Sequence, residues 1–252
     1  MQSLAKHFVY PYIIIHGKCL WCLQFFYVPC IIIQTAFRRN RMTNNTLIFG
    51  DSYSTFDTYI PEGYASWYFP HEQPETDVSK VSQTWWYQVV EEANLNLILN
   101  NSWSGSTICY TGYNNVDCSQ THSFIYRLHC LINEGFFAVN DIHTVFVFGG
   151  TNDNWSDAPL GSIQYDQYRK EDLYCVLPAI CYFFKTLRNT LPHAKIYCLI
   201  NTDLKSEIVD CFEQACHTYH ITKIAFNRID KREGHPTIQG MQDIKQQVLA
   251  AL

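Results

Sequence analysis

Short apolar runs alternate along the chain with stretches in which apolar residues recur every three or four positions. Runs of four to eight residues are typical of buried β-strands, whereas the longer spacing is typical of amphipathic helices. The sequence predicts strands at Thr46–Gly50, Leu95–Asn100, Thr144–Phe148, Lys195–Ile200 and Ile221–Phe226.

Three helical stripes separate or follow these runs. Strands that alternate with helices favour a parallel sheet covered on both faces, so we expect a single α/β domain over residues 42–252. The stripes consist of Val78, Val81, Trp85 and Val89 behind the capping candidate Asp77, then Leu173, Val176, Ile180, Phe184 and Leu187, and last Ile238, Met241, Ile244 and Val248.

Composition fits one such domain. The chain has 252 residues and 47% hydrophobic content, enough to bury one large core. Its formal net charge is −5, so nothing in it suggests a nucleic-acid-binding surface. Apart from a lone C-x-x-C at Cys19 and Cys22 there is no metal-binding spacing, and we expect neither metal nor cofactor.

Residues 1–41 differ from the rest. Positions 8–37 are apolar and aromatic, but Pro11, Lys18 and Pro29 interrupt them, and Arg38, Arg39 and Arg41 follow. We favour Met42 as the natural start and a cytoplasmic protein. The alternatives are a membrane anchor at 8–37, with the arginines on the cytoplasmic side, and a targeting segment.

Most of the 11 cysteines read as small buried hydrophobes in a reducing compartment. Cys109 and Cys118 are the exception, because they flank a polar loop and could close it as a disulfide in an exported protein.

Four polar turns carry the candidate chemistry. Ser52 lies in Gly50-Asp51-Ser52 after the first run, Gly105 after the second, and Asn152 in Gly149-Gly150-Thr151-Asn152-Asp153 after the third. His235 stands just before the last helical stripe. Each turn alone is explained by helix capping or turn preference, but their joint occurrence in strand context indicates a hydrolytic site.

These residue types suit attack on a carbonyl. A serine hydroxyl needs an adjacent base, and His235 is the best-placed candidate. The tetrahedral oxyanion needs fixed donors. Gly105 has no Cβ to keep the backbone away, and Asn152 offers an amide that does not titrate.

The ordered set resembles the SGNH (GDSL-type) hydrolase family over about residues 46–252, and is most similar to GDSL-type esterases of gut bacteria. The resemblance implies a flavodoxin-like, five-stranded, three-layer α/β/α sandwich with the site beyond the carboxyl ends of the strands. It also implies Ser52 as nucleophile, His235 as base, and an oxyanion hole of Ser52 N–H, Gly105 and Asn152.

Two positions depart from the family pattern. Tyr53 replaces a leucine that takes no part in the chemistry. Arg232 occupies the place of the aspartate that usually orients the histidine. The remaining acceptors are Asp230, Glu233 or a backbone carbonyl, of which we rank Asp230 first.

Two long loops, Tyr53 to Thr76 and Asn154 to Tyr168, are rich in aromatic residues. We expect Trp67, Tyr68 and Trp155 to contact substrate, with packing over the sheet edge as the alternative. The sequence thus predicts a serine esterase whose substrate is a carboxylic ester, with an acetylated carbohydrate as the leading class. The alternatives are a lysophospholipase or thioesterase acting on longer chains, and a non-catalytic ligand-binding module.

Overall fold

The computed structural model describes residues 44–252. The expectations for residues 1–41, which include the start at Met42, the membrane segment at 8–37 and the Cys19–Cys22 pair, lie outside the described residues. In the part of the chain that is described, no helix is both long and apolar enough to span a membrane.

A five-stranded parallel sheet forms the centre of the domain, with strand order β2-β1-β3-β4-β5. The five predicted strands are confirmed, each within two residues at either end. Their bounds are β1 Asn45–Gly50, β2 Asn96–Ser102, β3 Thr144–Phe148, β4 Lys195–Ile200 and β5 Thr222–Ala225.

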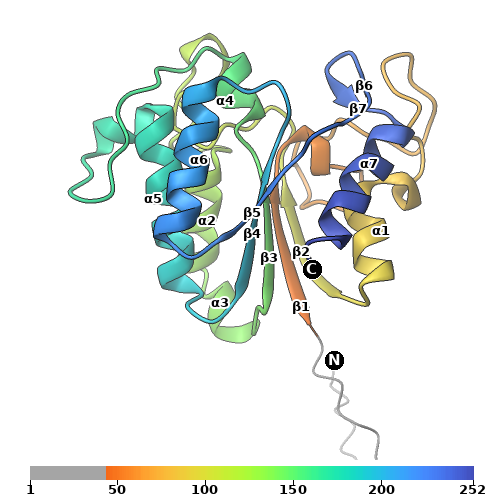
Figure 1. The fold of residues 1–252 in the computed structure, drawn as a ribbon, viewed down its shortest axis with the longest axis horizontal. Coiled ribbons are helices and arrows are strands. Elements are labelled where there is room, and N and C mark those ends of the chain that lie inside the picture. The colour runs from red at the N-terminus through yellow and green to blue at the C-terminus, as the bar shows by residue number, and fades with distance from the viewer. Residues whose placement is uncertain (1–43) are drawn as a thin grey trace, which may run out of the picture. The chain divides into compact units, whose positions relative to one another are not determined.

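Helices cover both faces of this sheet (Figure 1). One face carries α1 (Trp85–Glu92) and α7 (Ile238–Leu249), and the other carries α2 (Phe124–Asn133), α5 (Val176–Thr190) and α6 (Ser206–Thr218). The predicted three-layer α/β/α sandwich is therefore confirmed. Shorter helical segments are η1 Ser52–Ser54, η2 Val81–Gln83, η3 Tyr113–Asn115, α3 Phe136–Val139, α4 Thr151–Trp155 and η4 Lys170–Tyr174.

The two faces of β3 show how the sequence builds these layers. Val145 and Val147 belong to the core under α2, α5 and α6, while Phe146 and Phe148 belong to the core under α1 and α7. Successive side chains of a strand point to opposite faces, so a continuous apolar run serves both cores.

The helix predicted from Val78 is shorter than expected: α1 begins at Trp85, and the residues before it form the short helix η2 at Val81–Gln83. Asp77 does not cap that helix. Its Oδ1 instead accepts a hydrogen bond of 2.8 Å from the backbone N–H of Ile238, at the start of α7. The expectation that Asp77 caps the helix that follows it is therefore wrong; Thr237 is the N-cap of α7, and Asp77 accepts one further N–H at the same helix end.

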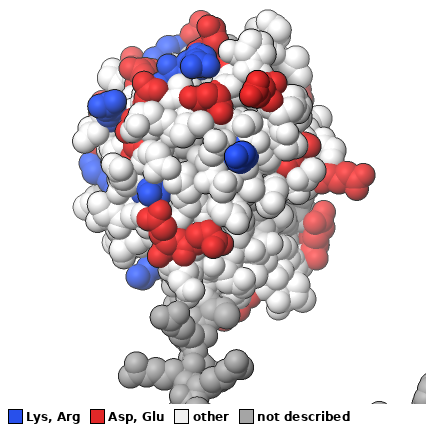
Figure 2. Space-filling model, turned by 90° about the vertical axis from the view of Figure 1, so that its right-hand side faces the viewer, with Lys and Arg blue, Asp and Glu red and all other residues white. Residues whose placement is uncertain are grey.

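Acidic and basic side chains are interspersed on the face that carries α1 and α7 (Figure 2). Such a mixed surface agrees with the modest net charge of −5.

Candidate active site

Ser52 stands where β1 ends. A Cβ at Gly50 would lie 2.4 Å from Ser102 Oγ and 2.5 Å from Ser54 Cβ, so only glycine lets the chain turn here. Asp51 then caps the short helix η1 by accepting a 3.0 Å hydrogen bond from the Tyr53 N–H. The turn places Ser52 at the carboxyl edge of the sheet, between β2 and β3.

His235 reaches Ser52 from a tight β-hairpin, β6 (Lys231–Arg232) with β7 (His235–Pro236). The two turn residues, Glu233 and Gly234, have φ of +47° and +74°, the left-handed pair that two-residue hairpins prefer. The distance from His235 Nε2 to Ser52 Oγ is 3.0 Å. The structure thus brings these two predicted residues into hydrogen-bond contact.

The backbone carbonyl of Glu233 orients the ring, 3.0 Å from His235 Nδ1. A carbonyl only accepts, so Nδ1 must carry the proton, and in a neutral imidazole this leaves Nε2 free to accept from the serine hydroxyl. Burial lowers the pKa of His235 from its ordinary value, against the raising effect of the Glu233 carbonyl. The histidine is therefore neutral, as a base must be, at neutral pH.

The structure does not pair Asp230 with His235, and this corrects the first-ranked expectation. The Asp230 carboxylate accepts a hydrogen bond from the Thr237 hydroxyl, the N-cap of α7. The tight turn places the Glu233 carbonyl, and not the Asp230 carboxylate, within hydrogen-bond distance of His235 Nδ1. Arg232 is exposed to solvent.

Three aromatic rings enclose His235. The Trp67 ring lies parallel to it, with centroids 3.7 Å apart and planes 9° apart. Trp155 and Tyr53 meet it at centroid distances of 5.6 and 5.5 Å. The Tyr53 hydroxyl also donates to the Gly234 carbonyl, so the residue that replaces the family leucine holds the histidine hairpin in place.

Tyr68, expected to contact substrate, does not face the site. It is completely buried, and its hydroxyl donates a 2.9 Å hydrogen bond to the Pro236 carbonyl. Adjacent residues of an extended segment point in opposite directions, so Tyr68 packs inward when Trp67 faces His235. Tyr68 therefore supports the His235 hairpin from the interior of the protein.

Gly105 and Asn152 lie on neighbouring turns that are tied together. Gly105 has φ of +80°, a left-handed conformation that favours glycine. Asn152 Nδ2 donates to the Ser106 carbonyl at 3.0 Å, and Asn152 Oδ1 accepts from the Tyr113 hydroxyl at 2.8 Å. These contacts fix which end of the amide carries its N–H groups and leave its second N–H for another acceptor.

Two buried carboxylates lie behind these turns. Asp153 accepts from the backbone N–H groups of Ile108 and Cys109 at 2.9 and 3.1 Å, which anchors the segment after Gly105. Asp51 has one oxygen, Oδ2, without a hydrogen-bond partner among the described residues. Burial, with a smaller contribution from the nearby Asp153, raises the pKa of Asp51 to about 7.

Arg127, on α2, is a functional candidate that the sequence analysis missed. Its side chain is 1% exposed, and its five N–H groups all donate. In the described chain the guanidinium has no carboxylate within ion-pair distance. Burial lowers the pKa of Arg127 to about 10, so it remains charged at neutral pH. The acceptors are Gly50 O at 3.2 Å, Ser106 Oγ at 3.1 Å, His122 O at 3.0 Å, Asn101 Oδ1 at 2.8 Å and Asn101 O.

The disulfide considered between Cys109 and Cys118 is not formed; both thiols are free and buried. Cys109 Sγ donates to the Thr111 carbonyl, and Cys118 Sγ lies 3.4 Å from His122 Nε2. The polar loop between them is closed by backbone hydrogen bonds, including Cys118 N to Tyr110 O at 2.7 Å.

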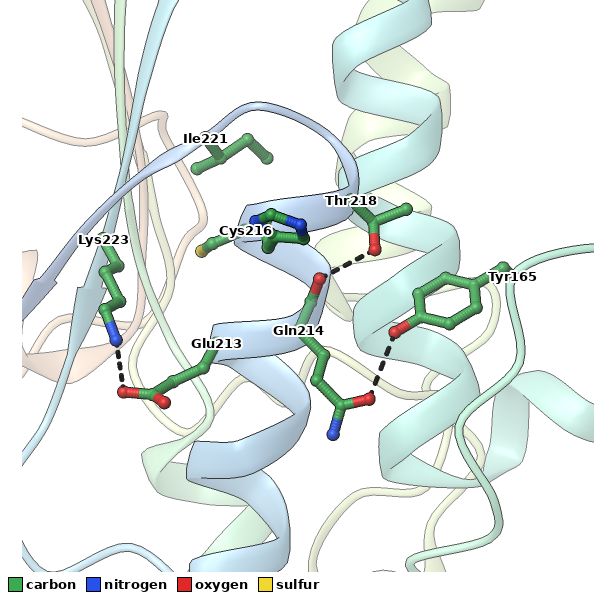
Figure 3. A pocket seen from close by; sticks show the side chains of 8 residues that line it. Tyr165, Glu213, Gln214, Cys216, Thr218, Ile221 and Lys223 are labelled. Atoms are coloured by element: carbon green, nitrogen blue, oxygen red, sulfur yellow. Dashed lines mark hydrogen bonds and ion pairs between the residues drawn. The ribbon is translucent and has the colours of Figure 1, made fainter.

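A cavity of about 550 Å³ between α6 and β5 contains none of the four motif residues (Figure 3). Its polar walls are paired among themselves, with Lys223 Nζ 2.6 Å from Glu213 and the Tyr165 hydroxyl 3.5 Å from Gln214. This cavity therefore lies apart from the candidate site at the carboxyl edge of the sheet.

A three-layer α/β/α sandwich with this serine and histidine at the carboxyl ends of its strands defines a hydrolase of the SGNH type. The chain belongs to the GDSL-like lipase/acylhydrolase family, whose model matches residues 44–252. It is accordingly an enzyme that hydrolyses ester bonds.

Solved structures agree with this assignment. A GDSL-like lipase from Bacteroides uniformis is 42% identical with a TM-score of 0.76, covering 83% of this chain and 95% of its own. One from Bacteroides ovatus is 39% identical with a TM-score of 0.75, covering 82% and 97%.

A more distant structure shares the fold alone. An acetyl xylan esterase from the rumen bacterium Butyrivibrio proteoclasticus is 16% identical with a TM-score of 0.54, covering 82% of this chain and 62% of its own. A comparison with curated proteins finds no match.

Proposed function

We propose that the protein hydrolyses a carboxylic ester through an acyl-enzyme on Ser52. The 3.0 Å contact between Ser52 Oγ and His235 Nε2 carries the proposal, together with the Nδ1–H tautomer that the Glu233 carbonyl imposes. His235 takes the serine proton as Ser52 attacks the ester carbonyl. It then returns that proton to the departing alcohol.

The oxyanion is held by the Ser52 and Gly105 backbone N–H groups and by the Asn152 side chain. The contacts of Asn152 with Ser106 and Tyr113 support this role, because they fix the amide before the charge develops. Water then attacks the acyl-enzyme, with His235 again as base, and releases the acid. No cofactor takes part in these steps.

The rival idea of a non-catalytic binding module rested on the basic residue at position 232. The Glu233 carbonyl offers His235 an acceptor although position 232 has no acid, and this supports turnover over binding alone. We also propose an acetylated carbohydrate as substrate class. The rings of Trp67 and Trp155 beside His235 support it, since aromatic faces pack on sugars.

Covalent labelling tests the mechanism. A fluorophosphonate probe is expected to label the wild-type protein on Ser52, and Ser52→Ala is expected to lose both labelling and p-nitrophenyl acetate turnover. The loss of turnover should reach at least roughly 10³-fold, because nucleophile and base act as a unit. Ser54→Ala is the matched control, since Ser54 is a buried serine on the same turn. Equal labelling of wild type and Ser52→Ala would contradict the mechanism.

A further inference from the structure

The loop that begins after Ser52 touches both halves of the catalytic arrangement. Trp67 stacks on His235 at 3.7 Å, and the Ala65 carbonyl accepts a 2.9 Å hydrogen bond from the Ser104 N–H, next to Gly105. Tyr64 and Trp103 reinforce this contact, with ring centroids 4.2 Å apart. The segment from Tyr64 to Trp67 therefore borders the site between the base and the oxyanion turn.

A groove of about 320 Å³ opens along this same segment. That volume lies at the small end of the range of ligand sites, roughly 300–1,000 Å³. It is lined by Ser66, Trp67, Phe69, Gln73 and Glu75. The walls thus combine two aromatic rings with an amide, a hydroxyl and a carboxylate.

Two donors in these walls have no acceptor. Trp67 Nε1 and Gln73 Nε2 are buried from solvent without a hydrogen-bond partner among the described residues. Buried polar groups of a folded protein are normally paired, and an unpaired one needs an explanation. Two such donors in one groove are explained by a ligand that brings its own oxygen acceptors.

We propose that this groove binds the alcohol half of the substrate, and that this half is a sugar; the proposal rests on the proposed function. Sugar hydroxyl oxygens accept from Trp67 Nε1 and Gln73 Nε2, and a sugar hydroxyl donates to the Glu75 carboxylate. The apolar face of the ring packs on the aromatic walls.

The same donors weigh against a long acyl chain in this groove. A hydrocarbon offers no acceptor, so it would leave both buried N–H groups unpaired. The position beside His235 agrees with an alcohol, because the base must hand its proton to the leaving oxygen. The groove therefore suits a polar alcohol half and not a long acyl chain.

Two esters with the same acyl group separate this inference from the proposed function. Ethyl acetate has no ring and no further hydroxyl, whereas 6-O-acetylglucose carries a sugar. Gln73→Leu and Glu75→Gln are each expected to raise KM for 6-O-acetylglucose about fivefold to tenfold, as loss of one hydrogen bond does. The kcat/KM for ethyl acetate should change less than about twofold.

Glu72→Gln is the matched control, because Glu72 is an exposed acid on the same loop that lines a different cavity. Gln73→Leu replaces an unpaired donor by an apolar group of similar size, so the fold should tolerate it. Binding of 6-O-acetylglucose to inactive Ser52→Ala can be measured by calorimetry. Adding Gln73→Leu or Glu75→Gln to Ser52→Ala should raise the Kd by the same factor, about fivefold to tenfold, as the rise in KM.

Hydrolysis of neither ester by the wild-type protein would overturn the proposed function. If both esters are hydrolysed and the Gln73 and Glu75 variants act on 6-O-acetylglucose like wild type, the groove assignment alone is overturned.

Discussion

At the scale of single residues, His235, the proposed base, is oriented by a carbonyl oxygen and not by an acid. His235 Nδ1 lies 3.0 Å from Glu233 O, while the Asp230 carboxylate is engaged by Thr237. Both contacts follow from the left-handed pair at Glu233 and Gly234, which brings the chain back on itself. Asp230 thus contributes to the start of α7 and makes no hydrogen bond with His235.

Asp230→Asn is accordingly expected to keep turnover of p-nitrophenyl acetate within about twofold of wild type. A triad aspartate changed to asparagine typically costs roughly 10⁴-fold, because the wrong histidine tautomer is favoured. Asparagine retains an oxygen that can accept from Thr237, so the protein should remain folded. Glu233→Gln serves as control, since it leaves the orienting carbonyl in place. A loss of 10³-fold or more in Asp230→Asn would return Asp230 to the site.

At the scale of secondary-structure elements, α2 is linked to the catalytic turns through Arg127. One guanidinium holds the end of β1 at Gly50, the end of β2 at Asn101 and the oxyanion turn at Ser106. These contacts join the turn of Ser52 to the turn of Gly105. Its charge also lies behind a site where negative charge develops.

Arg127→Lys is expected to lower kcat roughly 10- to 100-fold with a smaller change in KM, because a small displacement of the oxyanion turn weakens transition-state stabilisation. Lysine keeps the charge but has three donors where arginine has five. The measurement is steady-state turnover per folded molecule, together with the free energy of unfolding.

Arg188 provides a matched control at the other end of the sheet. It donates to the carbonyls of Leu191, Pro192, Ala194, Tyr219 and His220, before β4 and β5 begin. Arg188→Lys should lower stability and leave kcat unchanged. If Arg127→Lys and Arg188→Lys changed kcat equally, the role of Arg127 would be purely structural.

The sequence predicts elements well where the signal is local. The runs at β3 and β4 are found to the residue, because a continuous apolar strand is bounded by turn residues. The turns of Ser52, Gly105 and Asn152 are found for the same reason, because each follows such a run, whereas His235 is found because it precedes the last helix. Arg127, Asp153 and Tyr113 are missed because their partners lie far away in sequence. The helices α2 and α6 are also not predicted, and three of the five buried residues of α6 are cysteine or alanine, which give a weak apolar signal.

At the scale of the whole molecule, the site is built over carboxylates that the fold keeps from water. Burial raises the pKa of Asp51 to about 7, well above the ordinary 3.8. Burial also raises the pKa of Asp153, against the lowering effect of its backbone hydrogen bonds. Because the pKa of Asp51 is higher in the folded protein, the native state binds a proton that the unfolded chain has largely released between about pH 4 and pH 7.

The free energy of unfolding is therefore expected to fall as pH rises from about 4 to 7, by as much as about 1.4 kcal/mol per pH unit from Asp51 alone. The stabilising contribution of Asp51 is fully present below the pKa that it has in the unfolded chain. It is lost as the pH rises through the pKa that Asp51 has in the folded protein. Asp51→Asn, whose side chain does not titrate, should show a flatter profile in denaturant titrations at pH 4, 6 and 8.

Asp157→Asn is the control for this comparison. The Asp157 carboxyl is exposed, and its hydrogen bond with Lys205 lowers its pKa, so removing it should not flatten the profile. Parallel profiles for wild type and Asp51→Asn from pH 4 to 8 would show that Asp51 does not carry the effect.

The hairpin that presents His235 has an evolutionary consequence. An orienting group supplied by the peptide backbone is independent of the codon at any one position, so substitutions at 230, 232 and 233 that keep the turn leave it intact. The turn itself depends on chain conformation, with Gly234 at a φ of +74° and the Tyr53 hydroxyl bonded to the Gly234 carbonyl. A motif that requires an acid three residues before the histidine would not match this chain, although the Glu233 carbonyl already orients the ring of His235.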